Sequence, residues 1–172
     1  MPLPRTPDIS PIDETHLRRC VELATRALEN GDDPFGSVLT DADGVVLAEA
    51  LNRETTDADP TAHPELELVH WAIAHLTPEQ RATSTVYTSG EHCPMCAAAH
   101  GWAGLGRVVA AASAAQLAGW RAEWGLPKGP VAVIPLAEVV PGVEVVTPVP
   151  PFDVWMREVH LRARWRGAAE EK

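Results

Sequence analysis

His63-Pro64-Glu65 and, thirty positions later, Cys93-Pro94-Met95-Cys96 are the stretches that decide the fold assignment of this sequence. One histidine and two cysteines are suitable ligands for a tetrahedral Zn²⁺ that keeps its fourth position for water. We therefore predict that His63, Cys93 and Cys96 bind zinc. Glu65 is expected to move protons to and from that water without binding the metal itself.

Neither half of this pattern is specific by itself. A His-x-Glu triplet occurs often by chance, and a lone Cys-x-x-Cys pair can be redox-active or structural. In this order, each at the start of an expected helix, the two halves support each other. The alternative is a structural zinc site, which normally has a fourth protein ligand, and His92, His100 or a residue outside the motifs could supply it. We expect His92 to lie beside the site instead, because adjacent side chains seldom bind one small ion.

The composition is that of an ordinary globular protein. The chain has 172 residues, of which 45% are hydrophobic and 22% charged, and this predicts a single domain over residues 1–172. No apolar run is long enough for a membrane span, and the N-terminus lacks the apolar segment of a signal peptide. We expect a cytoplasmic enzyme with a loose, proline-rich segment at residues 1–9.

The charge balance argues against nucleic acid as a partner. The formal net charge is −10, whereas phosphate binding usually requires a basic surface. An arginine cluster near the C-terminus is the exception, and we interpret it as a solvated helix face. It consists of Arg157, Arg162, Arg164 and Arg166.

Helical and strand patterns alternate along the chain, which predicts an α/β layer fold. A first helix is capped by Ser10-Pro11 and ends at Gly31, with Cys20 on its buried stripe. Further helices are expected from His63, from Pro94, over 114–123 and over 151–166. Leu66, Val69, Ile73 and Leu76 should form the buried face of the second helix. Strands are expected on both sides of the 41–44 turn within Gly36–Leu51, and at Thr85–Ser89, Val108–Ala112 and Val131–Ile134.

Longer stretches around the two motifs resemble the cytidine-deaminase-like superfamily. The resemblance runs from about residue 14 to 112 and rests on Asn52-Arg53, on the segment from Asp59 to Glu65, and on Tyr87-Thr88-Ser89 followed by Cys93–Cys96. It is most similar to the guanine deaminase branch and its nucleobase and nucleoside deaminase relatives. The resemblance implies a three-layer αβα sandwich with a five-stranded mixed sheet, a bound Zn²⁺, Glu65 as proton shuttle, and a homodimer.

The same resemblance implies residues for substrate binding. Asn52 matches an asparagine that hydrogen-bonds the base, and Phe35 matches an aromatic residue that packs against the bound ring. Trp102, Glu123 and Trp155 are further candidates, the last on a C-terminal helix (150–172) that could act as a lid. A turn role for Asn52 and core packing for the aromatic residues are the alternatives.

Some positions depart from the family pattern. Pro64 replaces a more usual alanine, His92 replaces a proline, and His100-Gly101-Trp102-Ala103 replaces a different segment. These changes border the expected pocket and leave the substrate open, whereas the four catalytic positions are intact.

The expected function is hydrolytic deamination of a small aminated heterocycle, with guanine as the first candidate. Cytosine, cytidine, other nucleosides and aminotriazines share the same reactive pattern, an exocyclic amine beside a ring nitrogen. Deamination of adenosine in transfer RNA is a second hypothesis, which the net charge disfavours. A non-catalytic zinc module is the third, and the presence of Glu65 argues against it.

Overall fold

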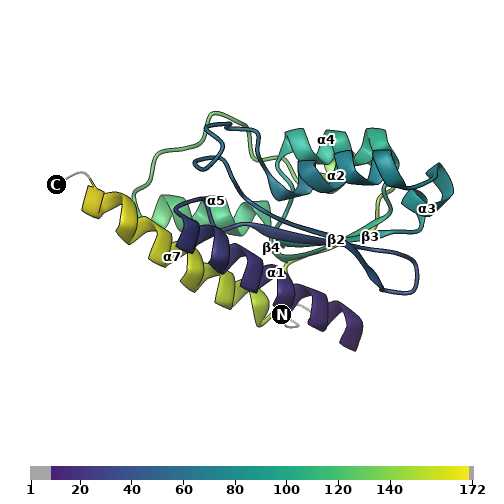
Figure 1. Cartoon of the computed structure of the whole chain (residues 1–172). Coiled ribbons are helices and arrows are strands. Elements are labelled where there is room, and N and C mark those ends of the chain that lie inside the picture. The colour runs from purple at the N-terminus through teal and green to yellow at the C-terminus, as the bar shows by residue number, and fades with distance from the viewer. Residues whose placement is uncertain (1–8, 171–172) are drawn as a thin grey trace.

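A computed structural model describes residues 9–170, with side chains described for residues 9–164. The predicted loose segment 1–9 lies outside these residues except for Ile9, which packs against the core. Figure 1 shows the elements. They are α1 (Pro11–Asn30), β1 (Gly36–Thr40), β2 (Val46–Leu51), α2 (Pro64–His75), α3 (Pro78–Ala82), β3 (Thr85–Gly90), α4 (Pro94–Ala103), β4 (Arg107–Ala112), α5 (Ala114–Glu123), α6 (Leu136–Val139), β5 (Val145–Val146) and α7 (Phe152–Glu170).

The five strands form one mixed sheet in the order β2-β1-β3-β4-β5, which confirms the predicted sheet. β1 pairs antiparallel with both β2 and β3, whereas β3, β4 and β5 run parallel. Because β3 and β4 are parallel, the chain must cross over between them, and α4 makes this connection.

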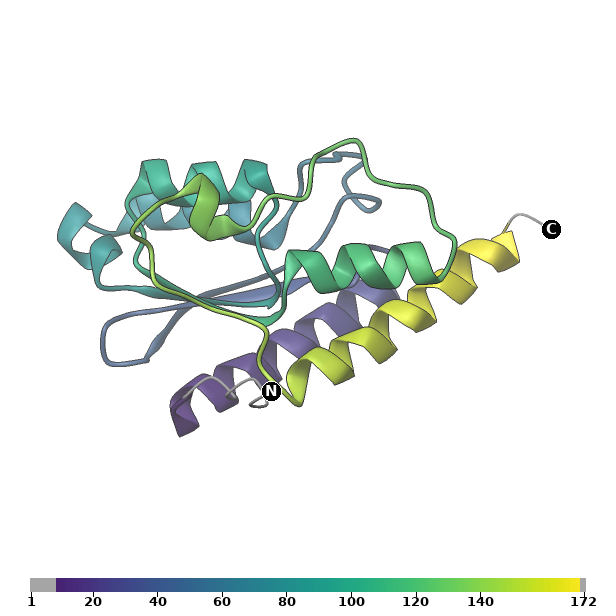
Figure 2. The same ribbon diagram turned by 180° about the vertical axis from the view of Figure 1, so that it is seen from behind.

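The predicted position of the fifth strand is wrong. Val131–Ile134 forms no strand, and Val131 and Val133 are 54% and 55% exposed. The strand is Val145–Val146, which pairs with Val108 and Val109 of β4. Val131–Ile134 lies instead between Pro130 and Pro135, in the connection from α5 to α6. Figure 2 shows this connection as a long arch.

Side chains that alternate along the strands build two separate cores. Val38, Tyr87 and Val109 face the cluster under α1, α5 and α7, whereas their neighbours Leu39, Val86 and Val108 face the cluster under α2, α4 and α6. Successive residues of a strand point to opposite faces, so one short sheet serves both layers. Helices therefore cover both faces of the sheet (Figures 1 and 2), and the predicted three-layer αβα sandwich is confirmed.

α1 begins and ends as its sequence predicts. The Ser10 side chain accepts a hydrogen bond from the Asp13 N–H, and the Asp13 carboxylate accepts one from the Ser10 N–H, which is a capping box. Gly31 ends the helix in the left-handed conformation with φ 95°. Gly36 lets α1 lie close to β1, because a Cβ there would come within 2.4 Å of the Leu23 Cβ.

The buried face of α2 differs in part from the prediction. Val69 is buried and Leu66 and Leu76 are half-buried, but Ile73 is 54% exposed. The buried residues of the helix are Pro64, Glu65, Leu68, Val69 and Ala72. The last four follow the i, i+3, i+4, i+7 pattern of one helix face, so the stripe that faces the sheet starts at Glu65.

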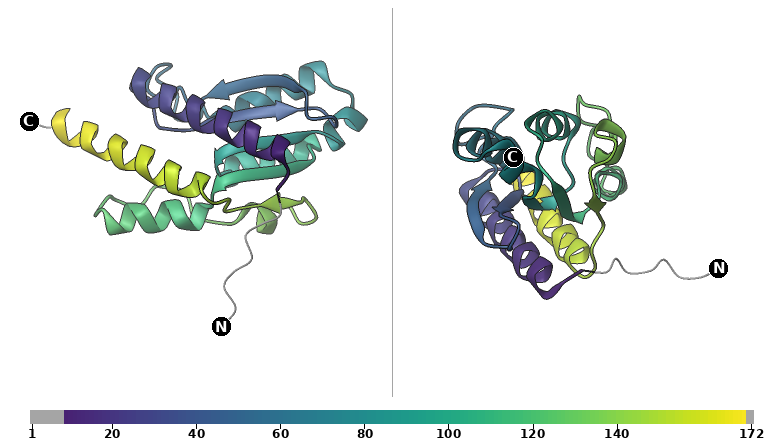
Figure 3. Two further views of the ribbon diagram at one scale, coloured as in Figure 1. Left: turned by 90° about the horizontal axis from the view of Figure 1, so that it is seen from below. Right: turned by 90° about the vertical axis from the view of Figure 1, so that its right-hand side faces the viewer.

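α7 lies beside α1 on one face of the sheet, as Figure 3 shows. Its Phe152, Met156 and Val159 are buried in the core shared with α1. Within the described part of the chain, none of the helices has the length and apolar character that a membrane span requires. The extent of the domain, residues 1–172, stays a prediction.

A buried carboxylate joins three elements at the start of α1. Asp13 is 3% exposed and accepts hydrogen bonds from the Tyr87 hydroxyl at 2.8 Å and from Arg107 Nη1 at 2.8 Å. Burial alone would raise the pKa of Asp13, but the hydrogen bonds from Arg107, the Ser10 N–H and Tyr87 lower it to about 2. The carboxylate thus holds α1 against β3 and β4.

We predict that Asp13→Asn lowers the free energy of unfolding by about 2 kcal/mol near neutral pH, since that is the size of the pKa shift in energy. The native pKa lies below the unfolded one, so this stabilisation is present above about pH 4 and is lost as the pH falls through about 2. Urea unfolding of both proteins across this range measures the difference. Asp43→Asn, an exposed turn residue, is the control. A difference that does not change with pH would contradict the prediction.

Candidate metal centre and active site

Two helix N-termini bring the predicted ligands together. His63 is the N-cap of α2 and Cys93 is the N-cap of α4, and each is followed by proline at the first helical position. Neither side chain makes a capping hydrogen bond to its own helix. α2 and α4 lie side by side on the same face of the sheet (Figure 1), so both side chains are free to point toward one spot.

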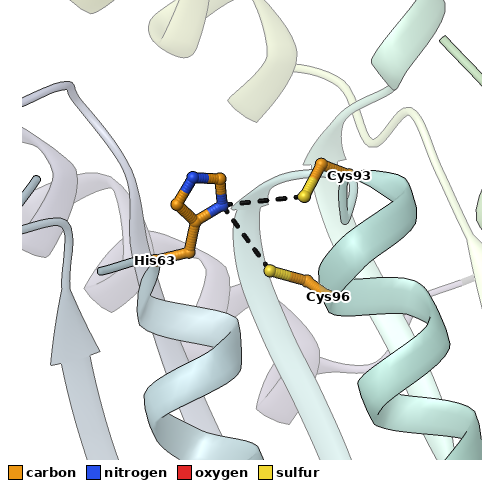
Figure 4. Close-up of side chains that lie close together, drawn as sticks. All are labelled: His63, Cys93 and Cys96. Carbon is orange, nitrogen blue, oxygen red and sulfur yellow. Dashed lines mark hydrogen bonds between the residues drawn. The ribbon is translucent and has the colours of Figure 1, made fainter. Parts of the chain in front are cut away.

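The three donor atoms are spaced as a tetrahedral zinc requires. His63 Nδ1 lies 3.7 Å from Cys93 Sγ and 3.5 Å from Cys96 Sγ, as Figure 4 shows. Usual zinc–nitrogen and zinc–sulfur bond lengths at a tetrahedral angle give a nitrogen–sulfur separation of about 3.6 Å. Among the described residues, the donor group consists of His63, Cys93 and Cys96, with all atoms within 4.8 Å. Three protein ligands leave the fourth position of a tetrahedral ion open.

The electrostatics of the cluster favour a cation. Hydrogen bonds from the Cys96 thiol and from His63 lower the pKa of Cys93 to about 4 despite burial. The same hydrogen bond with Cys93 raises the pKa of Cys96, and burial raises it further. A divalent ion binds both sulfurs as thiolates, so metal binding would release the proton that the two share.

Glu65 lies in the first turn of α2 beside this cluster. Its side chain is 5% exposed, and the Thr88 hydroxyl lies 2.9 Å from its Oε1. Burial raises the pKa of the carboxyl, whereas the charge of His63 and the contact with Thr88 oppose the rise. A carboxyl with a raised pKa can both take up and give back a proton at moderate pH.

Sequence reasoning missed Glu54. Its Oε1 lies 3.4 Å from His63 Nε2, on the side of the ring opposite to the sulfurs. Its Oε2 accepts a hydrogen bond from Asn52 Nδ2 at 2.8 Å. The polar composition of residues 52–62 indicated only a loop, and nothing in the local spacing marked one of its carboxylates as a neighbour of the ligand.

Asn52 lies at the end of β2 and is fully buried. Its N–H donates to the Phe35 carbonyl at 3.0 Å, and its Oδ1 accepts from the Glu54 N–H at 3.0 Å. One N–H of the amide is bound to Glu54, which leaves the second for another acceptor. The predicted contact of Asn52 with a substrate stays a prediction.

A cavity of about 550 Å³ has Asp33 and Phe35 in its wall. The metal ligands are not part of its wall. Two wall residues nevertheless interact with the site: the charge of His63 acts to lower the pKa of Asp33, and the Phe35 carbonyl accepts a hydrogen bond from the Asn52 N–H. Burial and the charge of Glu54 raise the pKa of Asp33. The wall residues that carry chemistry are Asp33, Phe35, Arg121, Trp124, His160 and Arg164.

α7 contributes a neutral histidine to this cavity. Burial, with a smaller effect from the charge of Arg121, lowers the pKa of His160 to about 4. Its ring packs edge-on against Phe35 with centroids 5.1 Å apart. Arg164, which we expected on a solvated face, also lines the cavity, whereas the side chain of Arg166 lies outside the described residues.

Three predicted substrate residues are not brought to this site. Trp102 is 92% exposed in the last turn of α4. Glu123 has a 57% exposed side chain that pairs with Arg157 at 2.7 Å. The Trp155 ring packs against Phe152, and the Arg18 guanidinium lies 5.1 Å from the centroid of the Trp155 ring. None of the three is among the residues that line the cavity.

The two histidines near the cysteines are buried together. His92 and His100 are 1% and 0% exposed, and their ring centroids lie 5.2 Å apart. His100 Nε2 lies 2.9 Å from the Gly106 carbonyl. Neither ring belongs to the donor group found among the described residues, so the geometry does not supply the fourth ligand of a closed structural site.

An open zinc centre with a buried acid beside it is the type of site found in metal-dependent hydrolases. Residues 10–112 match the family described as the cytidine and deoxycytidylate deaminase zinc-binding region. The match covers more than half of the chain and includes the three ligands and Glu65. The chain belongs to this family.

Relatives with different substrates share this region. Guanine deaminase of Bacillus subtilis is 43% identical over 91 residues, which are 52% of this chain and 58% of the relative. A tRNA-specific adenosine deaminase of Haemophilus influenzae is 34% identical over 104 residues, 60% of each chain. The chain thus spans little more than half the length of these relatives. A structure of guanine deaminase from Nitrosomonas europaea has a TM-score of 0.67 at 19% identity and covers 92% of this chain and 89% of its own, which shows the shared fold.

We predict that the purified chain binds one zinc ion and that Cys93→Ala and Cys96→Ala each abolish stoichiometric binding. Each substitution removes one of three ligands, and two ligands do not hold zinc tightly. Elemental analysis after dialysis against a weak chelator measures the zinc content. Cys20→Ala is the matched control, because Cys20 is a fully buried thiol of α1 outside the donor group. Full zinc content in both ligand variants would refute the site.

Proposed function

We propose that this protein is a zinc-dependent deaminase that hydrolyses the exocyclic amine of a small aminated heterocycle, with guanine as the first candidate. The observation that carries the proposal is the position of the buried Glu65 beside the open His63–Cys93–Cys96 centre. A structural zinc site needs no such acid. The 43% identity with a guanine deaminase supports guanine as the first substrate to test.

His63, Cys93 and Cys96 would hold a zinc ion, which would supply a water molecule acidified to near neutral pH. Glu65 would take a proton from this water as the water oxygen bonds to the reacting carbon, and would deliver it to the adjacent ring nitrogen. Glu65 would then take the remaining proton of the added oxygen and pass it to the amine, so that the carbon–nitrogen bond breaks, a carbonyl forms and ammonia leaves.

Thr88 allows Glu65 to change protonation state while its oxygen stays in place. Its hydroxyl lies 2.9 Å from Glu65 Oε1 and 2.9 Å from the Gly90 carbonyl, and it accepts from Ser37 at 2.9 Å. One hydroxyl has one proton to donate. Thr88 therefore donates to ionised Glu65, and when Glu65 is protonated it accepts from the acid and donates to Gly90.

The cavity lined by Asp33 and Phe35 is the proposed place for the heterocycle. Phe35 offers an apolar ring face, and neutral His160 offers one donor and one acceptor to the edge of a base. Hydrogen bonding to a substrate edge discriminates between bases far better than apolar contact alone. Cytosine, cytidine, other nucleosides and aminotriazines are the alternative substrates, and a homodimer in the cytoplasm stays a prediction.

Deamination of transfer RNA is the second candidate, because a relative with that activity is 34% identical. Binding to a polynucleotide requires neutralisation of several phosphates, and the net charge of −10 opposes it. Salt-dependent binding to transfer RNA, measured together with deamination of free bases, separates the two candidates.

We predict that Glu65→Gln retains zinc but lowers ammonia release by a factor of about 100 or more, since general acid–base catalysis contributes at least this much. The assay screens guanine, cytosine, adenine, their nucleosides and aminotriazines with the wild type, and then compares the variant on the best substrate. Glu67→Gln is the control on the exposed side of the same helix. Unchanged turnover in Glu65→Gln would exclude the mechanism, and a zinc-loaded wild type that acts on none of these compounds would favour the non-catalytic module.

For the best substrate, we expect Phe35→Ala to raise KM about tenfold, because a lost aromatic contact costs on the order of 1 kcal/mol or more. Steady-state kinetics measure the change. Trp102→Ala should leave KM unchanged because its ring is 92% exposed and outside the cavity. A larger effect at Trp102 than at Phe35 would place the substrate elsewhere.

A further inference from the structure

The connection from Asn52 to His63 is held by its own hydrogen bonds. The Arg53 N–H donates to the Ala62 carbonyl at 3.1 Å, which brings the two ends of the loop together. Within the loop, the Asp59 N–H donates to the Glu54 carbonyl at 3.0 Å. A chain segment with these internal bonds places its side chains reproducibly although it is neither helix nor strand.

A buried aspartate from another part of the chain fixes the same loop. Asp32 is 3% exposed and follows the C-terminus of α1. Its Oδ1 accepts from the N–H groups of Thr55 and Thr56 at 2.9 and 2.8 Å, and its Oδ2 accepts from the Thr56 hydroxyl at 2.6 Å. These bonds hold the backbone directly after Glu54 and therefore limit where the Glu54 carboxylate can point.

Both oxygens of that carboxylate face groups of the site. Oε1 lies 3.4 Å from His63 Nε2, and Oε2 accepts from Asn52 Nδ2 at 2.8 Å. The Asn52 side-chain oxygen in turn accepts from the Glu54 N–H at 3.0 Å. Glu54 thus joins the metal ligand to the amide that ends β2.

We propose that Glu54 is a positioning residue that sets the ring of His63 for metal binding and couples it to the amide of Asn52. A carboxylate beside Nε2 favours the proton on that nitrogen when Nδ1 gives up its own proton, which leaves the lone pair of Nδ1 free to bind an ion between it and the two sulfurs. The negative charge also makes the imidazole a stronger ligand. The link to Asn52 rests on the proposed function, whereas the effect on zinc does not.

Glu54 differs from the other acids near the site because its two oxygens contact two different residues, His63 and Asn52. Asp33 interacts electrostatically with His63, but burial raises the pKa of its carboxyl, and it lies in the cavity wall. Asp57 belongs to the same loop but pairs with Arg53 at 2.8 Å on the exposed side. Asp57→Asn is therefore a control that removes a loop carboxylate without removing the contact to the ligand.

The test measures zinc affinity by competition with a chromophoric chelator in the full-length chain, without substrate. We expect Glu54→Ala to weaken zinc binding at least tenfold, in the range found when an outer partner of a ligating histidine is removed. Glu54→Gln, which has nearly the same shape, should weaken it severalfold, and Asp57→Asn should match the wild type. The Gln variant decides the result if the Ala variant does not fold: an affinity within twofold of the wild type overturns the proposal.

Nitrogen NMR of the His63 ring gives a readout that a general loss of stability would not produce. In the zinc-loaded proteins, in which Nδ1 binds the metal and Nε2 carries the proton, we expect the Nε2 resonance of the wild type to shift in Glu54→Gln because the charged neighbour is lost. Identical Nε2 shifts in the two zinc-loaded proteins would also overturn the proposal. If every deamination assay fails but the Glu54 variants weaken zinc binding as expected, only the proposed function and the substrate side of the link to Asn52 are refuted.

Discussion

The convergence of two helix N-caps is the constraint on which the rest of the site depends. His63 and Cys93 occupy positions where a side chain usually turns back to cap its own helix, and here both turn toward each other. Proline at the next position starts each helix without needing that cap. Cys96, one turn into α4, completes the donor set, and Glu65 occupies the first turn of α2. The local sequence of each helix start thus supplies both the fold signal and the chemistry.

The sheet makes this convergence possible because it holds the two helices in a fixed relation. β1 lies between β2 and β3, and the strands that precede α2 and α4 therefore lie two positions apart in one sheet. Alternating strand residues pack α2 and α4 on one face and α1, α5 and α7 on the other. The polar junction of Asp13 with Tyr87 and Arg107 ties the second layer to the same strands, so that the two faces cannot shift independently.

Local signals explain which features were predictable from the sequence. The N-cap at Ser10, the C-terminal Gly31 and the two ligand motifs depend on neighbours a few residues away, and all of these features form as expected. Glu54 and Val131–Ile134 depend on distant partners. The first reaches His63 because Asp32 holds its loop, and the second is displaced from the sheet edge by Val145–Val146. Trp102, Glu123 and Trp155 were proposed from their aromatic or acidic type at positions outside the two ligand motifs, and residue type alone does not set the direction of a side chain.

The metal centre and the cavity lie in different parts of the chain. The three ligands and Glu65 lie within residues 10–112, the part of the chain that matches the family. Much of the cavity wall lies beyond it, on α5, on the segment that follows α5 and on α7. The chemistry of deamination requires only the first set, because the same ion and acid serve any ring with an amine beside a nitrogen. If the heterocycle binds in the cavity, as proposed, selection among such rings falls to the second set, in which His160, Arg121 and Arg164 line the wall. The proposal therefore assigns substrate choice mainly to the C-terminal third of this chain, where a histidine and two guanidinium groups line the same cavity as Phe35.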